Sequence, residues 1–146
     1  MSASNAFETS LLNLLFLNID IANIGDAAGL QNSVAAGSFH ISLHTADPGE
    51  AGTQATSEAT YTGYARVAVA RTGAGWVVIG NTADNAAPVT FPACTGGTNI
   101  VTHFGVGTDS AGVGNMIVRG ALAASLSVSS GITPSFATGT LDITAD

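Results

Sequence analysis

The spacing of hydrophobic and polar positions changes near residue 38. Before it, the stretch 4–18, SNAFETSLLNLLFLN, repeats its apolar side chains at helical spacing and predicts an α-helix. Asn5 and Glu8 have the spacing of a capping box, which marks the predicted start of this helix. The apolar face predicted for the helix consists of Phe7, Leu11, Leu14 and Leu15.

Residues 18–37, between the helix and the change of period, mix asparagine, glycine and alanine with isolated apolar residues. This composition predicts a loop with room for one short helical turn. We therefore expect residues 1–37 to form an N-terminal helix and connecting arm, and residues 38–146 to form the body of a single globular domain.

From Ser38 onward, apolar and polar residues alternate, and turn residues recur at short intervals. The alternation is clear in Phe39, Ile41 and Leu43, which share one side of the first predicted strand. The pattern predicts a mainly β fold, an antiparallel β-sandwich of jelly-roll-like or immunoglobulin-like type with one N-terminal helix. The predicted strands are 38–44, 64–71, 75–79, 87–91, 100–106, 115–122, 124–128, 132–136 and 140–144.

Glycine-rich connections separate these strands. RTGAGW at 71–76 and GTDSAGVGN at 107–115 each predict a hairpin between neighbouring strands. The connection at 45–63, TADPGEAGTQATSEATYTG, is much longer and has the composition of a flexible loop. Loops of this length in compact domains are usually functional or mobile.

Charge is scarce in this chain. Charged residues make up 9% of the sequence, against a typical share of about 25%. There is no lysine, and the net charge is −7, so nucleic-acid binding through phosphate neutralisation is excluded as a function. A surface with so few charges is easier to explain if much of it faces other subunits. For Arg66, Arg71 and Arg119, ion pairs within the fold and ion pairs across a subunit contact are both open.

The N-terminal apolar stretch has no basic residue before it and is interrupted by Asn13, Asn18 and Asp20. We therefore expect neither a secretion signal nor a membrane anchor. Cys94 is the only cysteine, which excludes an internal disulfide and favours a small buried side chain at that position. Trp76 is expected in the core, and the alternative is a surface aromatic anchor for a partner.

His40 and His44 have the spacing of two metal ligands on a helix, but the alternation around them predicts a strand. Positions four apart in a strand lie roughly 13 Å from each other, too far to share one zinc ion. We expect both histidines on the polar face, solvated or hydrogen-bonded. The alternative is a ligand set completed by His103 or Asp47, but no metal or cofactor is predicted.

Candidate catalytic groups are weak. Asp47, Pro48 and Gly49 fit a tight turn, and no G-x-S-x-G nucleophile elbow is present. Paired carboxylates could come only from a loop whose composition is that of a flexible connection. We therefore do not expect an enzyme. The carboxylates concerned are Asp47, Glu50 and Glu58.

Several stretches together resemble a family of small tailed-bacteriophage virion proteins, which are often described as tail-fibre-like or head-fibre proteins. The resemblance lies in ETSLLNLLF, LHTADPGEAG, YTGYARVAV, VTFP, VTHFGV and FATGTLDIT, and it covers nearly the whole chain. The sequence departs from the family pattern mainly through DIANIGDAAGLQNSVAAG, before the first predicted strand.

The resemblance implies a non-enzymatic structural protein of the virion, assembled in the cytoplasm of the bacterial host. Its first interpretation is a capsid decoration or cement protein, usually a trimer, that binds the major capsid protein or other virion proteins and stabilises the shell. The alternative is a component of a head fibre, tail fibre or baseplate involved in host attachment. Candidate partner contacts are Phe7, Leu11, Leu15, Asp47, Glu50, Tyr61 and Tyr64, the two tyrosines as exposed aromatics of the long loop.

Overall fold

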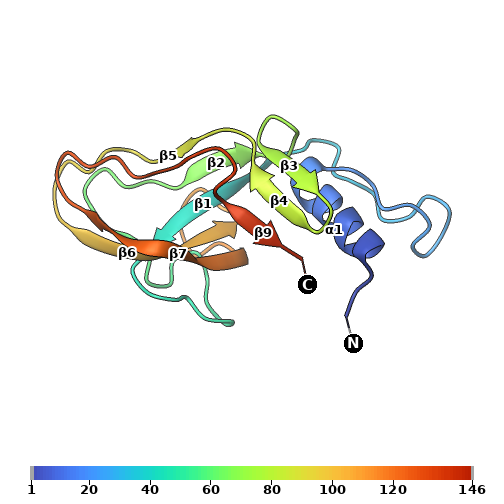
Figure 1. Ribbon diagram of the computed structural model, residues 1–146, viewed down its shortest axis with the longest axis horizontal. Helices are drawn as coiled ribbons and strands as arrows, with labels where there is room; N and C mark the ends of the chain where they lie inside the picture. The colour runs from blue at the N-terminus through green and yellow to red at the C-terminus, as the bar shows by residue number, and fades with distance from the viewer. Residues whose placement is uncertain (1, 146) are drawn as a thin grey trace. The chain divides into compact units, whose positions relative to one another are not determined.

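The computed structural model describes residues 2–145, which form antiparallel β-sheets and one N-terminal helix (Figure 1). The predicted mainly β fold class is therefore confirmed. The helix and strands are α1 (Asn5–Leu17), β1 (Ser38–His44), β2 (Val67–Ala70), β3 (Trp76–Ile79), β4 (Thr82–Asn85), β5 (Val89–Thr90), β6 (Asn99–Gly107), β7 (Met116–Val128), β8 (Ser135–Phe136) and β9 (Asp142–Thr144).

The described residues group into two compact units, each built from several stretches of the chain. Residues 2–38, 70–88 and 136–145 form the first unit, and residues 39–69 and 89–135 form the second. The prediction of one globular domain stays a prediction, and the two units are described separately below.

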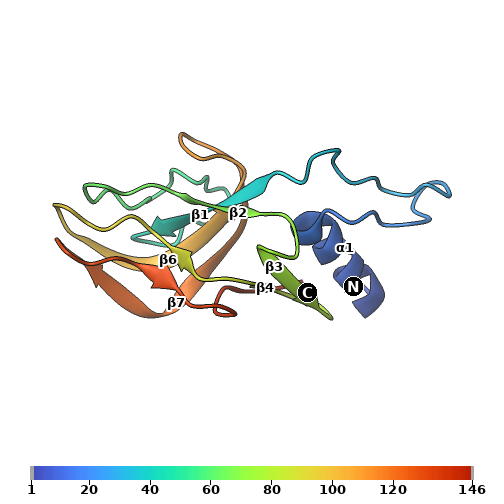
Figure 2. The same ribbon diagram turned by 90° about the horizontal axis from the view of Figure 1, so that it is seen from above.

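In the first unit, α1 packs on a three-stranded antiparallel sheet with the order β3-β4-β9 (Figure 2). The contact centres on Phe16 of α1 and Trp76 of β3, whose ring centroids lie 4.6 Å apart in an edge-to-face arrangement. Both rings are fully buried, so the expectation that Trp76 lies in the core is confirmed.

The buried face of α1 differs from the predicted one. Glu8, Leu12 and Phe16 are buried, whereas Phe7 is exposed and the predicted leucines are only half-buried. The helix is apolar around most of its circumference, so its own periodicity does not fix which side meets the sheet. The predicted start is also displaced, because Ser4, not Asn5, is the N-cap and accepts a hydrogen bond from the amide of Phe7 at 3.4 Å.

The C-terminal end of α1 is held by Arg71. Its guanidinium donates to the carbonyl oxygens of Leu14 and Leu15, which have no partner inside the helix, and to that of Ala36. A cation at this end also complements the helix dipole. Thus Arg71 binds backbone oxygens of its own unit.

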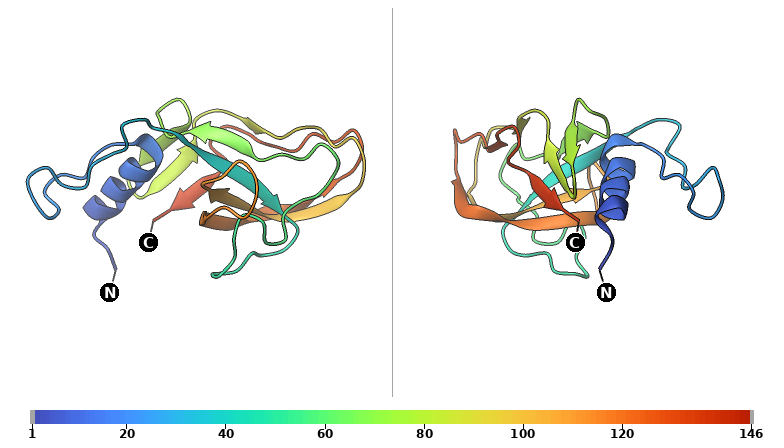
Figure 3. Two further views of the ribbon diagram at one scale, coloured as in Figure 1. Left: turned by 180° about the vertical axis from the view of Figure 1, so that it is seen from behind. Right: turned by 45° about the vertical axis from the view of Figure 1, so that its right-hand side comes forward.

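Residues 18–37 form the predicted loop (Figure 3, light blue). Asn18 ends the helix in the left-handed conformation with φ 56°, and one isolated bridge joins Ile21 to Leu30. The side chain of Asp26 accepts the amides of Ala28 and Gly29 in a tight turn between them. The loop is therefore ordered by polar contacts, while several of its apolar side chains point to solvent.

The second unit contains a four-stranded antiparallel sheet with the order β2-β1-β6-β7 and the short pair β5–β8. In Figure 1, β5 runs above β1, β6 and β7, which gives the unit a sandwich-like arrangement. The core lies between them, and the buried Cys94 belongs to it, as predicted. Its other buried side chains include Ile41, Leu43, Tyr61, Val89, Phe91, Val101, Val106 and Val128.

Most predicted strands correspond to an observed strand, usually with different bounds, and the prediction fails in three places. β1 has the predicted bounds, and GTDSAGVGN is the hairpin between β6 and β7. However, the two strands predicted at 115–122 and 124–128 are one strand, β7. RTGAGW is not a hairpin, because β2 and β3 belong to different sheets. β4 was not predicted at all.

The missed strand β4 follows a two-residue turn. Ile79 pairs with Thr82, so Gly80 and Asn81 form the connection, with Gly80 at φ 61°. Glycine with positive φ at the first turn position is typical of tight hairpins. The signal was present in the sequence, but the polar residues of TADN concealed the strand that follows.

Candidate functional site

The two histidines of the opening strand lie four positions apart on β1, as predicted, and they differ in their surroundings. His40 is half-buried, whereas His44 is fully buried. The long loop pairs with the end of β1. The amide of Thr45 donates to the carbonyl oxygen of Ser57, and the amide of Ala59 donates to that of Leu43. The long loop thus lies against the strand, and His44 is hydrogen-bonded rather than solvated, which is one of the two states expected for it.

His44 forms a hydrogen-bonded chain under this loop. Its Nδ1 lies 2.8 Å from the carbonyl oxygen of Thr56, and its Nε2 lies 2.8 Å from the hydroxyl of Ser42. Because a carbonyl oxygen can only accept, Nδ1 carries the proton and Nε2 accepts from Ser42. Burial lowers the pKa of His44, which agrees with a neutral ring.

A serine that donates to a histidine is also the arrangement of a nucleophile and its base. Ser42 and His44, however, are both fully buried, so no substrate reaches the hydroxyl while the loop is in place. The arrangement therefore acts as an internal support of the loop. Within residues 2–145, no group of three or more histidine, cysteine, aspartate or glutamate side chains is placed to hold a metal ion.

A second buried group, Glu58 with Arg66 and Tyr64, joins the loop to the start of β2. Arg66 donates from Nε and from a terminal nitrogen to the two carboxylate oxygens of Glu58, at 2.6 and 2.7 Å. The same carboxylate accepts the Tyr64 hydroxyl at 2.8 Å, and that hydroxyl accepts the amide of Leu43. Burial raises the pKa of Tyr64, and the Glu58 carboxylate raises that of Arg66.

Arg66 and Gln54 tie the loop to the hairpin 107–115. Arg66 donates to the carbonyl oxygens of Asp109 and Gly112 at 2.9 and 2.6 Å. Gln54 is fully buried, donates to the carbonyl of His40 and accepts the amide of Asp109. The loop is therefore anchored at both ends and in the middle, which contradicts its prediction as a flexible connection. Sequence reasoning missed Gln54 because its partners lie far away in the chain.

The exposed carboxylates of the loop meet Arg119 of β7. Arg119 forms ion pairs with Asp47, at 2.8 Å, and with Glu50, so this arginine pairs within its own unit. The pKa of Asp47 is lowered mainly by the hydrogen bond from the backbone amide of Gly49. The positive charge of Arg119 lowers it further. The hydrogen bond from Gly49 confirms the turn predicted at Asp47-Pro48-Gly49.

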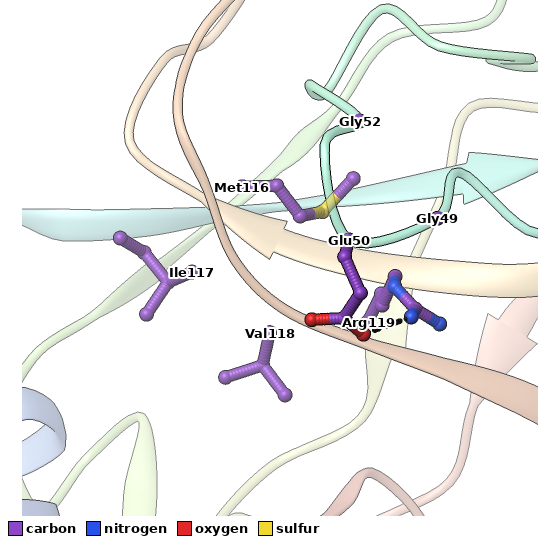
Figure 4. Close-up of a pocket in the computed structure, with 7 residues that line it drawn as sticks. All are labelled: Gly49, Glu50, Gly52, Met116, Ile117, Val118 and Arg119. Carbon is purple, nitrogen blue, oxygen red and sulfur yellow. Dashed lines mark hydrogen bonds and ion pairs between the residues drawn. The ribbon is translucent and has the colours of Figure 1, made fainter.

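An open groove of about 340 Å³ runs between this part of the loop and β7 (Figure 4). It is lined by Gly49, Glu50 and Gly52 on one side and by Met116–Arg119 on the other. Four consecutive residues of one strand contribute to it, which indicates that the groove follows the edge of β7.

The remaining predicted contact residues are placed as follows. Tyr61 is 3% exposed and donates to the carbonyl of Pro92, so the prediction of an exposed aromatic there is wrong. Tyr64 is half-buried in the network with Glu58. Phe7 is 41% exposed, and Leu11 and Leu15 are half-buried on α1. Their role in partner contacts stays a prediction.

Comparison with protein families identifies the class to which the chain belongs. One family model matches residues 2–144, and it defines a class of fibre-like virion proteins of tailed phages, as the resemblance in the sequence predicts. The family is Gp80, described as Podophage GP4 fiber I protein gp80, and the chain belongs to it. No curated protein matches the chain. None of the helices described is long and apolar enough to cross a membrane.

Proposed function

We propose that this protein is a non-enzymatic structural subunit of a fibre on the head of a tailed phage, attached to the capsid shell by protein–protein contacts. Its membership of the family described as fiber I carries this proposal. The buried polar groups support a structural role, because Ser42, His44 and Arg66 are used to fasten the long loop. Assembly in the host cytoplasm is part of the same proposal.

The small size of the two units favours attachment of the protein to a larger assembly. Between residues 2 and 145, the only helix is α1 with 13 residues, and the other elements belong to two compact units. Neither forms a long shaft. A fibre built from such a chain needs other proteins to give it length and position, and the major capsid protein is the partner we propose.

The N-terminal arm is the contact that we propose for the shell. Its loop exposes four large apolar side chains, and α1 adds Phe7. Val34 is fully exposed. Apolar side chains exposed within one segment of the chain favour a protein–protein contact there. The four loop side chains are Ile19, Ile24, Leu30 and Val34.

A cement role is a second candidate, and the scarcity of surface charge favours it. A protein that binds only the assembled shell stabilises the shell by mass action, so bound protein would raise the temperature at which capsids open. A fibre subunit that binds a single capsomer equally well inside and outside the shell would leave the opening temperature of the capsid unchanged. The melting temperature of capsids with and without bound protein separates the two roles.

Attachment through the arm is tested by Val34→Asp, with Val113→Asp as the matched control. Val113 is a 66% exposed valine of the hairpin 107–115, so both changes place a carboxylate on a surface valine. In cosedimentation with capsids that lack this protein, we expect Val34→Asp to lose binding and Val113→Asp to retain it. Equal binding by both variants would contradict the contact, and no sedimentation of the unchanged protein would contradict capsid attachment.

A further inference from the structure

The sheet β3-β4-β9 of the first unit is covered on one face only. α1 packs on the inner face, to which the buried Trp76, Ala83 and Ile143 belong (Figure 2). Because side chains alternate between the two faces of a strand, the register of the three strands brings another set together on the outer face. All members of this set are exposed or half-buried, so no layer formed by residues 2–145 covers the outer face. The set consists of Val77, Ile79, Thr82, Asp84, Asp142 and Thr144.

The part of the outer face on β3 is apolar. Val77 and Ile79 point to the same side of this strand, and they are 43% and 73% exposed. Neighbouring aliphatic side chains on an open sheet face gain free energy when another surface removes them from water. This part of the face therefore favours a partner that brings apolar side chains.

The part of the outer face on β4 and β9 is acidic. Asp84 and Asp142 lie directly opposite each other in the register of the two strands. Opposed side chains of antiparallel strands have Cβ atoms about 4.5–5.5 Å apart, and opposed like charges destabilise the sheet. Partial burial raises the pKa of Asp84, and the charge of Asp142 raises it further. The sheet thus holds two carboxylates together against their repulsion.

The cations of the chain are used elsewhere. The sequence has no lysine and three arginines. Arg66 and Arg119 pair with carboxylates of the second unit, and Arg71 donates to carbonyl oxygens at the end of α1. The ion pairs between residues 2 and 145 include neither Asp84 nor Asp142. A second copy of the chain, with a net charge of −7 and the same occupied arginines, is therefore a poor source of the missing cation.

Arginine is the cation that fits two opposed carboxylates. Its planar guanidinium carries five N–H donors in a fixed fork, so one side chain can donate to both carboxylates at once, whereas lysine is a compact, strongly hydrated point charge. Val77 lies directly opposite Asp84 on the other side of β4 from Asp142. An apolar side chain beside the arginine would therefore reach β3 and exclude water from the ion pair, which strengthens it.

We propose that the outer face of β3-β4-β9 binds a segment of another protein in which an arginine is flanked by apolar side chains. The guanidinium binds Asp84 and Asp142, and the flanking side chains cover Val77 and Ile79. This docking face uses none of the residues proposed for the capsid contact of the N-terminal arm, so it goes beyond that contact. That the partner is a virion protein rests on the proposed function, whereas the chemistry of the face does not.

Titration of the full chain with a short peptide, followed by the NMR signals of its backbone amides, tests this chemistry. The probe is a pentapeptide with blocked ends and the sequence valine-serine-arginine-serine-valine, whose valine and arginine side chains share one side when it is extended. The matched control has citrulline in place of arginine, which retains the shape and removes the charge. We expect the arginine peptide to shift the amide signals of β3, β4 and β9, and the citrulline peptide to leave them in place.

A carboxylate variant separates binding from folding. Asp142→Asn removes one acceptor and also the repulsion from Asp84, so its melting temperature should equal or exceed that of the unchanged protein. Its affinity for the arginine peptide should fall by about tenfold or more, as expected when a hydrogen bond to a charged group is lost. The control Asp109→Asn removes an exposed carboxylate from the hairpin 107–115 and should bind as the unchanged protein does.

An isoleucine variant tests the apolar part of the face. Ile79→Ser should weaken binding of the arginine peptide. The control Ile100→Ser changes a 61% exposed isoleucine of β6 and should not weaken it. Equal affinities of the two serine variants would contradict the part assigned to β3.

Four further results would overturn the proposal. These are the absence of any shift with the arginine peptide, equal shifts with the citrulline peptide, and unchanged affinity in Asp142→Asn. The fourth is a titration in which calcium chloride, but not the arginine peptide, shifts the signals of Asp84 and Asp142, which would assign the carboxylates to a metal ion. Each of these results leaves the fibre role intact, because that role is tested separately by cosedimentation of Val34→Asp with capsids.

Discussion

At the scale of single residues, buried polar side chains decide how the long loop is held. His44, Gln54 and Arg66 each bond to backbone groups of a distant segment, and each is buried. Burial of a polar group is tolerable only when its hydrogen bonds are made. Such side chains therefore fix one position of the loop on β1.

The buried neutral state of His44 predicts a pH dependence of stability. Its pKa in the folded protein lies below the ordinary value of 6.5, so the unfolded chain binds the proton more readily. The stabilising contribution is present above about pH 6.5 and is lost as the pH falls from there toward the folded pKa. The free energy of unfolding should decrease by up to about 1.4 kcal/mol per pH unit in that range.

Urea unfolding between pH 5 and 8 measures this effect, and His44→Gln is the comparison. The variant retains His40 and His103 but has no titrating group at position 44, so its stability should change less over the same range. Identical pH profiles for the two proteins would show that His44 is not the group responsible.

At the scale of secondary structure elements, local sequence patterns predicted where a strand or helix lies better than they predicted which other element it packs against. Phe39, Ile41 and Leu43 alternate clearly, and the bounds of β1 were predicted correctly. The choice of partner depends on residues far apart in sequence, so RTGAGW between β2 and β3 gave no sign that these strands belong to different sheets. The buried side of α1 was missed because Trp76, which selects it, lies in β3.

The candidate site shows the same limit. The strand predicted at His40 and His44 is confirmed, because the alternation of neighbouring side chains indicates it locally. The burial of His44 and Tyr61 could not be deduced locally, since it arises from the folded loop and from the β5 side of the unit. Low hydrophobicity of a loop does not exclude that it is anchored by polar contacts.

The anchoring of the long loop predicts different effects for its two arginine contacts. Arg66→Ala leaves the largely buried Glu58 carboxylate without its cation, and removal of one partner from a buried pair costs about 3–5 kcal/mol. Arg119→Ala affects only exposed carboxylates, so little change in stability is expected.

Limited digestion with a glutamate-specific protease distinguishes the two contacts. Cleavage after Glu58 should be faster in Arg66→Ala than in the unchanged protein, and Arg119→Ala should alter cleavage only after Glu50. Fragment masses identify the position. Equal resistance at Glu58 in all three proteins would contradict the role of Arg66 as the anchor of the loop.

At the scale of the whole molecule, the protein combines low charge with two kinds of unprotected surface. One is the apolar loop of the N-terminal arm, and the other is the outer face of the sheet β3-β4-β9. A free protein would be expected to cover such surfaces, whereas a subunit of a larger particle uses them for contacts. The chain belongs to a phage fibre family, so the phage particle is the assembly in which other proteins would cover both surfaces.

Electron microscopy of purified phage particles labelled with gold-conjugated antibodies to this protein tests its role most directly. We predict label on fibres that project from the head of every particle, and none on particles made without the gene. Label confined to the tail, or particles that carry no label at all, would contradict a fibre subunit attached to the capsid.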